Sequence, residues 1–211
     1  MRHTAARTLA IAGALLGWAA LLLQLVLLID SFQAQGGTVL GGVWRFVGYF
    51  TILTNILAAV VLTHAGARPG TTSGLGDSRI ELSVATAMAL VGIVYSVLLR
   101  ALWDPQGWQK VADVTLHDVI PVIVVLFFLL RGHGALHWRD SAFALIFPLS
   151  YCAYALVRGA ADGWYAYPFL DPSKLSAAQM AANMAGLMLG VWMVAVALIA
   201  LAKLVGRKRE A

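Results

Sequence analysis

Six long apolar runs, separated by short polar segments, follow one another along the chain. They cover approximately residues 6–29, 44–64, 80–103, 114–130, 141–161 and 175–205. An α-helix needs about 20 mostly apolar residues to cross the hydrocarbon core of a bilayer, and the runs match or approach that length. The segments 65–78 and 104–107 contain the Gly, Pro, Ser and Asp residues that interrupt helices. The pattern predicts an all-α, polytopic integral membrane protein in which residues 1–211 form a single domain of six transmembrane helices.

Two other interpretations of the apolar runs fit the pattern less well. A secretory signal peptide has an apolar core of about 7–15 residues, whereas the run at 6–29 is longer and lacks a good cleavage site. Strands of a membrane barrel are about ten residues long and alternate between polar and apolar positions. These runs are longer and continuous, so helices are predicted throughout, including a retained first helix.

The composition agrees with burial in lipid. Of the 211 residues, 61% are hydrophobic and only 12% are charged, against about 25% charged residues in soluble domains. The net charge of +5 does not indicate nucleic-acid binding, because the basic residues lie at the ends of the apolar runs and form no patch. The single cysteine, Cys152, excludes an intrachain disulfide.

The distribution of basic residues predicts the orientation of the bundle, since cytoplasmic segments carry the excess of Lys and Arg. With the N-terminus inside, the inner segments contain ten basic residues: Arg2, Arg7, Arg68, Arg79, Arg131, Arg139, Lys203, Arg207, Lys208 and Arg209. The outer segments and their borders contain five: Arg45, Arg100, Lys110, Arg158 and Lys174. Both termini are therefore predicted to be cytoplasmic.

Polar side chains within the runs are concentrated in the outer half of the predicted bundle. Each of the six helices contributes one: Gln24, Thr51, Arg100, His117, Arg158 and Asn183. At 1.5 Å per residue, Thr51 lies roughly 10 Å below Trp44, and His117 lies about 6 Å below Asp113. The inner half carries chiefly hydroxyl groups. Because polar groups in membrane helices usually face the interior and often mark function, this layer predicts a polar pocket that opens toward the outer side.

Each of these residues also has a purely structural interpretation. The Thr51 hydroxyl can bond the carbonyl four residues back, and Asn55, one turn further on, can join two helices through a hydrogen bond. His117 can bond a neighbouring carbonyl. Arg100 and Arg158 can extend toward lipid headgroups, and Asp118 can face Lys110 or water. His, Cys, Asp and Glu residues show no metal-site spacing within a helix, so neither a metal nor another cofactor is predicted.

Three stretches resemble the androgen-induced and androgen-dependent family of membrane hydrolases. They are residues 41–51 (GGVWRFVGYFT), residues 116–121 (LHDVIP) and residues 164–171 (WYAYPFLD). They occur in the family's helix order, so the resemblance extends over most of the chain. Eukaryotic members cleave fatty acid esters of hydroxy fatty acids. This chain is similar to a bacterial, six-helix relative, which implies a location in the bacterial cytoplasmic membrane.

The resemblance implies the identity of the reactive residues. Thr51 matches the family's intramembrane threonine nucleophile, and His117 matches its histidine. Thr54 is a second threonine close by. A histidine of near-neutral pKa suits the task of taking the threonine proton. If Thr51 lies inside a helix, no backbone N–H is free to stabilise an oxyanion, so side chains are expected to do so. Candidates for substrate or oxyanion binding are Asn55, Asn183, Arg100, Arg158 and Asp118.

The sequence leaves three functional hypotheses open. The first is a membrane-embedded hydrolase that cleaves a lipid or fatty acyl ester with Thr51 as nucleophile and His117 as base. The second is a transporter or receptor that binds an amphiphilic ligand in the same pocket, which requires a polar path toward the inner side. The third is a structural protein whose polar layer only joins helices.

Overall fold

The computed structural model describes residues 2–102, 104–133 and 136–207. Every regular element within these ranges is a helix. Six of the described helical spans are long and apolar enough to cross a membrane: Thr4–Ala34, Phe50–Ala67, Ser78–Val97, Gly107–Arg131, Trp138–Asp162 and Ala177–Gly206. The molecule thus has the architecture of a polytopic integral membrane protein, as the sequence predicts. Lys208 and Arg209 of the orientation argument, and Trp103 at the end of the third run, lie outside the described residues.

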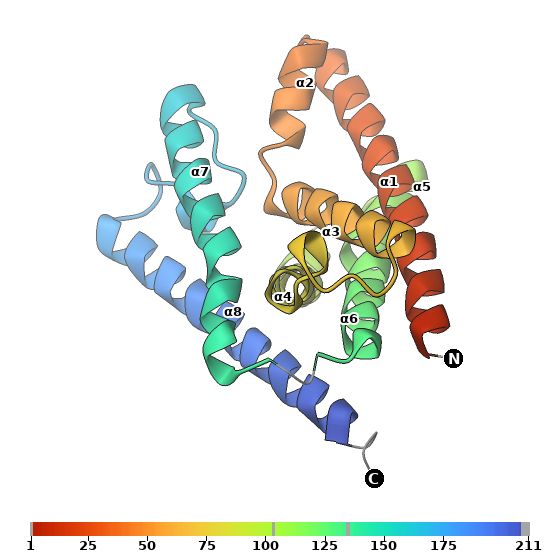
Figure 1. The fold of residues 1–211 in the computed structure, drawn as a ribbon. Coiled ribbons are helices and arrows are strands. Elements are labelled where there is room, and N and C mark those ends of the chain that lie inside the picture. The colour runs from red at the N-terminus through yellow and green to blue at the C-terminus, as the bar shows by residue number, and fades with distance from the viewer. Residues whose placement is uncertain (1, 103, 134–135, 208–211) are drawn as a thin grey trace.

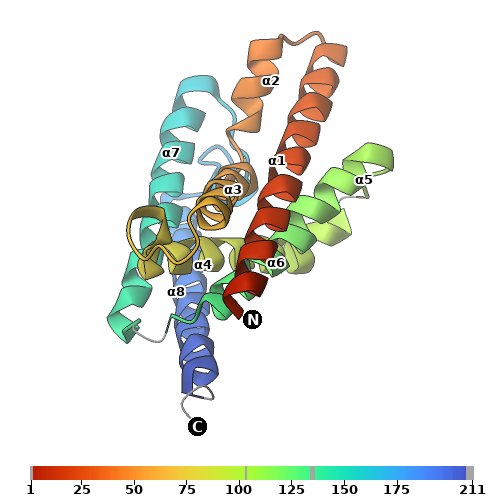
Figure 2. The same cartoon turned by 45° about the vertical axis from the view of Figure 1, so that its right-hand side comes forward.

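The helices form a central group with a helix pair on either side (Figures 1 and 2). One pair is α1 (Arg2–Ala34) with α2 (Val39–Phe46), and the other is α7 (Ile146–Asp162) with α8 (Ala177–Arg207). In Figure 1, α3 (Phe50–Ala67), α4 (Ser78–Val94) and α6 (Ile120–Arg131) lie between the two pairs, whereas α5 (Gly107–Val114) extends past α1 on the side away from α7 (Figure 2). Short helices fill the connections at Gly74–Gly76, Arg100–Leu102, Trp138–Leu145 and Pro168–Leu170.

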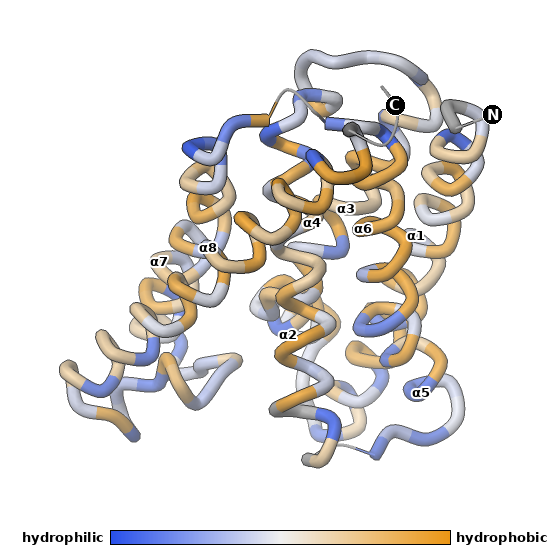
Figure 3. Tube along the Cα trace, turned by 90° about the horizontal axis from the view of Figure 1, so that it is seen from below, coloured by the Kyte–Doolittle hydropathy of each residue, from blue (hydrophilic) through white to orange (hydrophobic). Residues whose placement is uncertain are grey.

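Apolar positions predominate along the middle of the helices, and most polar positions gather at the two ends (Figure 3). Helix α1 begins and α8 ends on the same side of the bundle (Figure 3), as an even number of crossings requires. On that side, a large apolar cluster joins α1, α3, α4, α6 and α8, with Leu62, Leu82, Met88, Phe127 and Phe128 almost fully buried.

A buried ionic cluster also lies on the side of the bundle where the chain begins and ends. Glu81 is only 2% exposed, and its carboxylate lies 3.0 Å from Arg131 and 2.8 Å from His133. Arg131 donates a further hydrogen bond to the Thr71 carbonyl, 2.7 Å away. The expectation that the inner half carries chiefly hydroxyl groups is therefore wrong: a carboxylate on α4 is held between a cation and a histidine at the end of α6.

Two of the long helices widen into π-helical turns. Helix α4 continues into a π-helix at Tyr95–Leu99, and α5 continues through a π-helix at Thr115–Val119 into α6. Pro121 explains the second one: it has no N–H to give, and its ring would clash with the carbonyl four residues back. The Ile120 N–H bonds the Thr115 carbonyl, five residues earlier. The fourth spanning helix also begins at Gly107, seven residues before the predicted start at Val114.

The second apolar run is not one helix, contrary to the prediction for residues 44–64. Helix α2 ends at Phe46, three residues turn without helical structure, and α3 begins at Phe50. The break leaves backbone carbonyls without helical partners in an apolar environment, where an unsatisfied polar group costs several kcal/mol. Nothing in the residue types Val47, Gly48 and Tyr49 breaks the hydrophobic pattern, so the run reads as continuous in the sequence.

Side chains from one face of α7 satisfy the carbonyls at this break. The Tyr151 hydroxyl donates to the Gly48 carbonyl (2.9 Å), the Tyr154 hydroxyl donates to the Val47 carbonyl (3.1 Å), and Arg158 donates to the Trp44 carbonyl. The three donors share a face of α7 because they are spaced three and four residues apart. We name this set of bonds the α7 clamp. It holds the end of α2 and the start of α3 against α7.

Aromatic packing completes the α7 clamp. The Arg158 guanidinium lies 4.2 Å from the centre of the Trp44 ring and 5.2 Å from that of Trp164, and its Nε lies 3.5 Å from the Asp162 carboxylate. A Cβ atom at Gly48 would overlap Arg158 and Trp164. Arg158, at 5% exposure, is therefore a buried structural cation, and glycine is required where the break passes it.

Tyr151→Phe is expected to lower the free energy of unfolding by about 1 kcal/mol, because the ring is kept while the Gly48 carbonyl loses its donor. The measurement is the thermal midpoint of the purified protein in detergent. Tyr165→Phe is the matched control, since the Tyr165 hydroxyl makes no hydrogen bond among the described residues. Equal midpoints for the two variants would contradict the α7 clamp.

Candidate functional site

Thr51 is the second residue of α3, and this position corrects the expectation that it lies inside a helix. The first hydrogen bond of α3 runs from the Leu53 N–H to the Tyr49 carbonyl, at 3.2 Å. The N–H groups of Phe50, Thr51 and Ile52 therefore have no partner within their own helix. They carry the positive end of the helix dipole. Backbone donors are thus present beside the threonine hydroxyl, where the sequence had indicated side chains alone.

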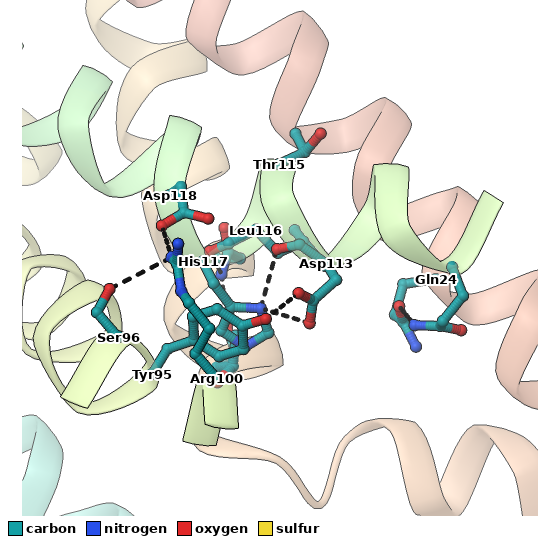
Figure 4. A network of polar contacts seen from close by, with 12 residues as sticks. Gln24, Tyr95, Ser96, Arg100, Asp113, Thr115, Leu116, His117 and Asp118 are labelled. Carbon is teal, nitrogen blue, oxygen red and sulfur yellow. Dashed lines mark hydrogen bonds and ion pairs between the residues drawn. The ribbon is translucent and has the colours of Figure 1, made fainter. Parts of the chain in front are cut away.

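His117 lies in the second π-helix and is held by Asp113 and Tyr95 (Figure 4). Its Nδ1 is 3.0 Å from the Asp113 carbonyl and 3.2 Å from the Asp113 carboxylate. Both partners are acceptors, so Nδ1 carries the proton and the lone pair of the neutral ring lies on Nε2. The Tyr95 hydroxyl donates to the same carboxylate, and its ring stacks on His117 with 4.2 Å between ring centres. This arrangement presents Nε2 as a base.

Asn55 connects the turn that carries Thr51 with the turn that carries His117. Its side-chain amide donates to the Thr51 carbonyl (2.8 Å) and to the Leu116 carbonyl (3.2 Å). The second bond compensates for Pro121, which has no N–H to give to either Leu116 or His117. Asn55 is fully buried. It contacts the backbone of both turns and is absent from the lining of the cavities described next, so it positions the two turns.

Two cavities meet at the Thr51 and His117 side chains. The larger, of about 310 Å³, is lined on one side by Gln24, Gln109, Asp113 and Tyr49. The smaller, of about 50 Å³, is lined mainly by apolar side chains of α4, α7, α8 and the turn before α8. Four residues line both cavities: Thr51, Tyr95, His117 and Tyr167. The potential nucleophile and the potential base therefore border the same space, and an elongated molecule can lie past them in both directions.

Tyr167 covers the N-terminus of α3. Burial raises the pKa of its phenol, and hydrogen bonds from the Thr51 side chain and from the backbone of Thr51 and Phe50 act in the opposite direction. Tyr167 also lines both cavities together with Thr51, so its side chain lies near the free donors at the start of α3. This tyrosine belongs to the segment between α7 and α8. That segment therefore covers the N-terminus of α3 and forms one wall of the site.

Asp171 stabilises the turn that joins the Tyr167 segment to α8. Its carboxylate accepts hydrogen bonds from the Ser173 hydroxyl (2.6 Å) and the Ser173 backbone N–H (3.0 Å), and it lies 3.3 Å from the Lys174 ammonium. The bond from Ser173 is the main reason that the pKa of Asp171 is below its usual value. The stretch at residues 164–171 therefore contributes both the tyrosine and a carboxylate that holds the turn that follows it.

The other residues that the sequence singled out lie elsewhere. Arg100 pairs with Asp118 and also bonds the Ser96 hydroxyl at 3.3 Å (Figure 4). Asp118 borders a separate groove between α4 and α6 that also reaches His117. Arg158 belongs to the α7 clamp. Asn183 is exposed and donates to the Phe169 carbonyl at 3.3 Å. The structure thus brings Thr51, His117 and Gln24 together and leaves Arg100, Asn183 and Arg158 outside the cavity lining.

Sequence reasoning did not single out Tyr95 or Gln109, and it named no residue that orients His117. Asp113 does so. Its place four residues before His117 puts the two on one helical face, which was a usable signal. Gln109 donates to Gln24 at 2.8 Å, and both side chains line the larger cavity. Tyr95 had no signal of its own, because an aromatic residue in an apolar run is ordinary.

No group of three or more His, Cys, Asp and Glu side chains able to hold a metal occurs within residues 2–102, 104–133 and 136–207. Comparisons with protein-family models, with curated proteins and with solved structures find no match. The resemblance to the androgen-induced family therefore stays a prediction, and functional argument rests on the geometry of the site.

Asn55→Leu is expected to destabilise the protein by about 1 kcal/mol, because the Leu116 carbonyl loses its donor at nearly constant side-chain volume. Thermal unfolding in detergent measures the loss. Asn183→Leu is the control, since that amide is exposed and makes a single long bond. If both variants unfold at the temperature of the unmodified protein, Asn55 does not join the two turns.

Proposed function

We propose that the protein is a membrane-embedded hydrolase of lipid or fatty acyl esters, with Thr51 as nucleophile and His117 as general base. The observation that carries the proposal is that these two side chains line the same two cavities, while Asp113 holds His117 with Nε2 free. A threonine hydroxyl becomes an effective nucleophile only when a base takes its proton. A carboxylate that orients the histidine is the third member of such a set.

The proposed reaction has two halves. His117 Nε2 takes the Thr51 proton as the hydroxyl oxygen attacks the ester carbonyl carbon. The resulting oxyanion is stabilised by the backbone N–H groups at the start of α3. When the carbon–oxygen bond to the alcohol breaks, the alcohol leaves with the proton from His117, and an acyl–threonine ester remains. Water then attacks this ester with His117 again as base, which releases the acid and restores Thr51.

Tyr167 has a defined place in this proposal. Its side chain lines the same two cavities as Thr51, close to the donors that the oxyanion requires. The ester carbonyl oxygen would take the position of the phenol when substrate binds. The N–H donors at the start of α3 are then never left without a neighbouring oxygen in an apolar environment.

The environment of the site favours a substrate dissolved in lipid. The site lies between helices that are apolar enough to cross a membrane, and the smaller cavity is almost wholly apolar. The proposed location is the bacterial cytoplasmic membrane, with both termini in the cytoplasm, on the basis of the excess of basic residues in the corresponding segments. Fatty acid esters of hydroxy fatty acids, the substrates of the family that the sequence resembles, are one candidate class.

A transporter would require a polar path from the site to the other side of the bundle. Along α4, the buried apolar residues Leu82, Val84, Ala85 and Met88 separate the ionic cluster at Glu81 from the site at Tyr95. This packing favours a pocket that is used from one side, as an ester hydrolase requires.

Thr51→Val is expected to reduce ester hydrolysis by about 1000-fold or more, because the nucleophile is removed while the β-branched shape is kept. Thr54→Val is the matched control: its hydroxyl is buried and donates to the Phe50 carbonyl at 2.8 Å. A lipid-like fluorophosphonate should label Thr51 in the unmodified protein, as mapped by mass spectrometry. Undiminished turnover by Thr51→Val, or a label on another residue, would disprove the assignment.

Asp113→Asn is expected to lower kcat by about 100-fold or more, because the amide no longer fixes the proton on His117 Nδ1. Steady-state hydrolysis of the same fluorogenic ester measures the change. Asp118→Asn is the control on the neighbouring turn, since its carboxylate pairs with Arg100 instead. Comparable losses in both variants would show that Asp113 does not orient the base.

A further inference from the structure

The two cavities that meet at Thr51 differ in both size and chemistry. The larger has a volume of about 310 Å³ and the smaller about 50 Å³. Polar groups line the larger cavity from α1 and α5, where Gln24 and Gln109 form a hydrogen bond of 2.8 Å. An ester has two unlike halves, an acyl chain and an alcohol, so the difference between the cavities determines which half each one accepts.

The smaller cavity is narrow and predominantly apolar. Apart from the four residues shared with the larger cavity, its walls are aliphatic or aromatic side chains, a proline, Tyr151 and Cys152. Most of these are buried: Leu90, Val91, Pro148, Tyr151, Cys152 and Leu170. The Tyr151 hydroxyl is already bound to the Gly48 carbonyl. A group that enters this cavity finds few free hydrogen-bonding partners, so the cavity suits an alkyl chain.

The volume of the smaller cavity limits the length of that chain. A water-sized group requires roughly 10–15 Å³ of such volume, so about 50 Å³ holds roughly four groups. A methylene is about as bulky as a water molecule. Beyond the carbonyl carbon at Thr51, the cavity therefore accepts a chain of about three to five carbons, which corresponds to a butanoyl or hexanoyl group.

The order of events assigns the alcohol to the larger cavity. After the first half-reaction the acyl chain is still attached to Thr51, whereas the alcohol has to leave and water has to enter. Water is stabilised where polar groups line the route, and Gln24, Gln109 and Asp113 line the larger cavity. The larger cavity therefore serves the alcohol and the water, and the smaller one retains the acyl group.

We infer that the substrate is an ester of a short acyl chain, of about four to six carbons, with a larger amphiphilic alcohol. This inference rests on the proposed hydrolase function. It commits the smaller cavity, whose walls include Cys152 and Leu187, to acyl-chain selection.

The first test is a series of 4-nitrophenyl esters with acyl chains from acetyl to hexadecanoyl. We expect kcat/KM for the butanoyl or hexanoyl ester to exceed that for the dodecanoyl ester by about tenfold or more. Leu187→Ala enlarges the cavity and should move the optimum to longer chains. Leu189→Ala is the matched control, since Leu189 is 54% exposed on the same helix and lines neither cavity. Hydrolysis without a chain-length optimum, or an equal shift in both variants, would overturn the inference while leaving the hydrolase proposal intact.

A second test does not require turnover. Cys152 is the chain's single cysteine and borders only the smaller of the two cavities. Butanoate and hexanoate should slow its modification by methyl methanethiolsulfonate, as measured by intact-protein mass spectrometry, and hexadecanoate should not. If no ester is hydrolysed but the short acids still protect Cys152, the hydrolase proposal fails and the acyl cavity stands. Equal protection by hexadecanoate, or no protection by any acid, would refute the acyl cavity.

Discussion

The start of α3 depends on the α7 clamp, the three hydrogen bonds that α7 donates to carbonyls at the break after α2. A transmembrane helix that stops and restarts exposes backbone groups that lipid cannot satisfy. The clamp satisfies the carbonyl side of the break. The N–H groups on the other side of the break, at the start of α3, lie beside Thr51 and Tyr167. The candidate site lies at this point. A helix that ran unbroken from Trp44 would have used those N–H groups internally and would have left the threonine without donors.

An irregular turn with an unpaired backbone carbonyl also forms the part of the site around His117. Pro121 prevents an ordinary helical turn, and the chain responds with a π-helix that leaves the Leu116 carbonyl open to Asn55. Tyr95 comes from the first π-helix, Tyr95–Leu99, in the continuation of α4. Gly92 lets α4 approach the turn that carries His117, since a Cβ atom at this position would lie only 3.3 Å from the His117 carbonyl oxygen. Irregular turns in three helices therefore place Thr51, His117 and Tyr95 around one space.

The number and type of spanning helices could be predicted from the apolar runs, because lipid imposes a strict length on them. Thr51 and His117 were found through a resemblance and through their polarity in apolar runs. The break at residues 47–49 could not be predicted, because its cause lies on α7, about 100 positions further along the chain. Asn55, Arg158 and Asn183 were selected by residue type, and type does not distinguish a side chain that lines a cavity from one that bonds a backbone carbonyl.

The Tyr167 side chain lies at the start of α3, and this position affects the affinity of any ligand that binds at the site. A ligand oxygen that binds to the N–H groups at the start of α3 has to displace the Tyr167 phenol from beside them. The measured affinity is then reduced by the free energy of moving the Tyr167 segment. Small ligands with a single carbonyl should bind weakly for this reason, and the larger part of any affinity must come from the alkyl and alcohol portions.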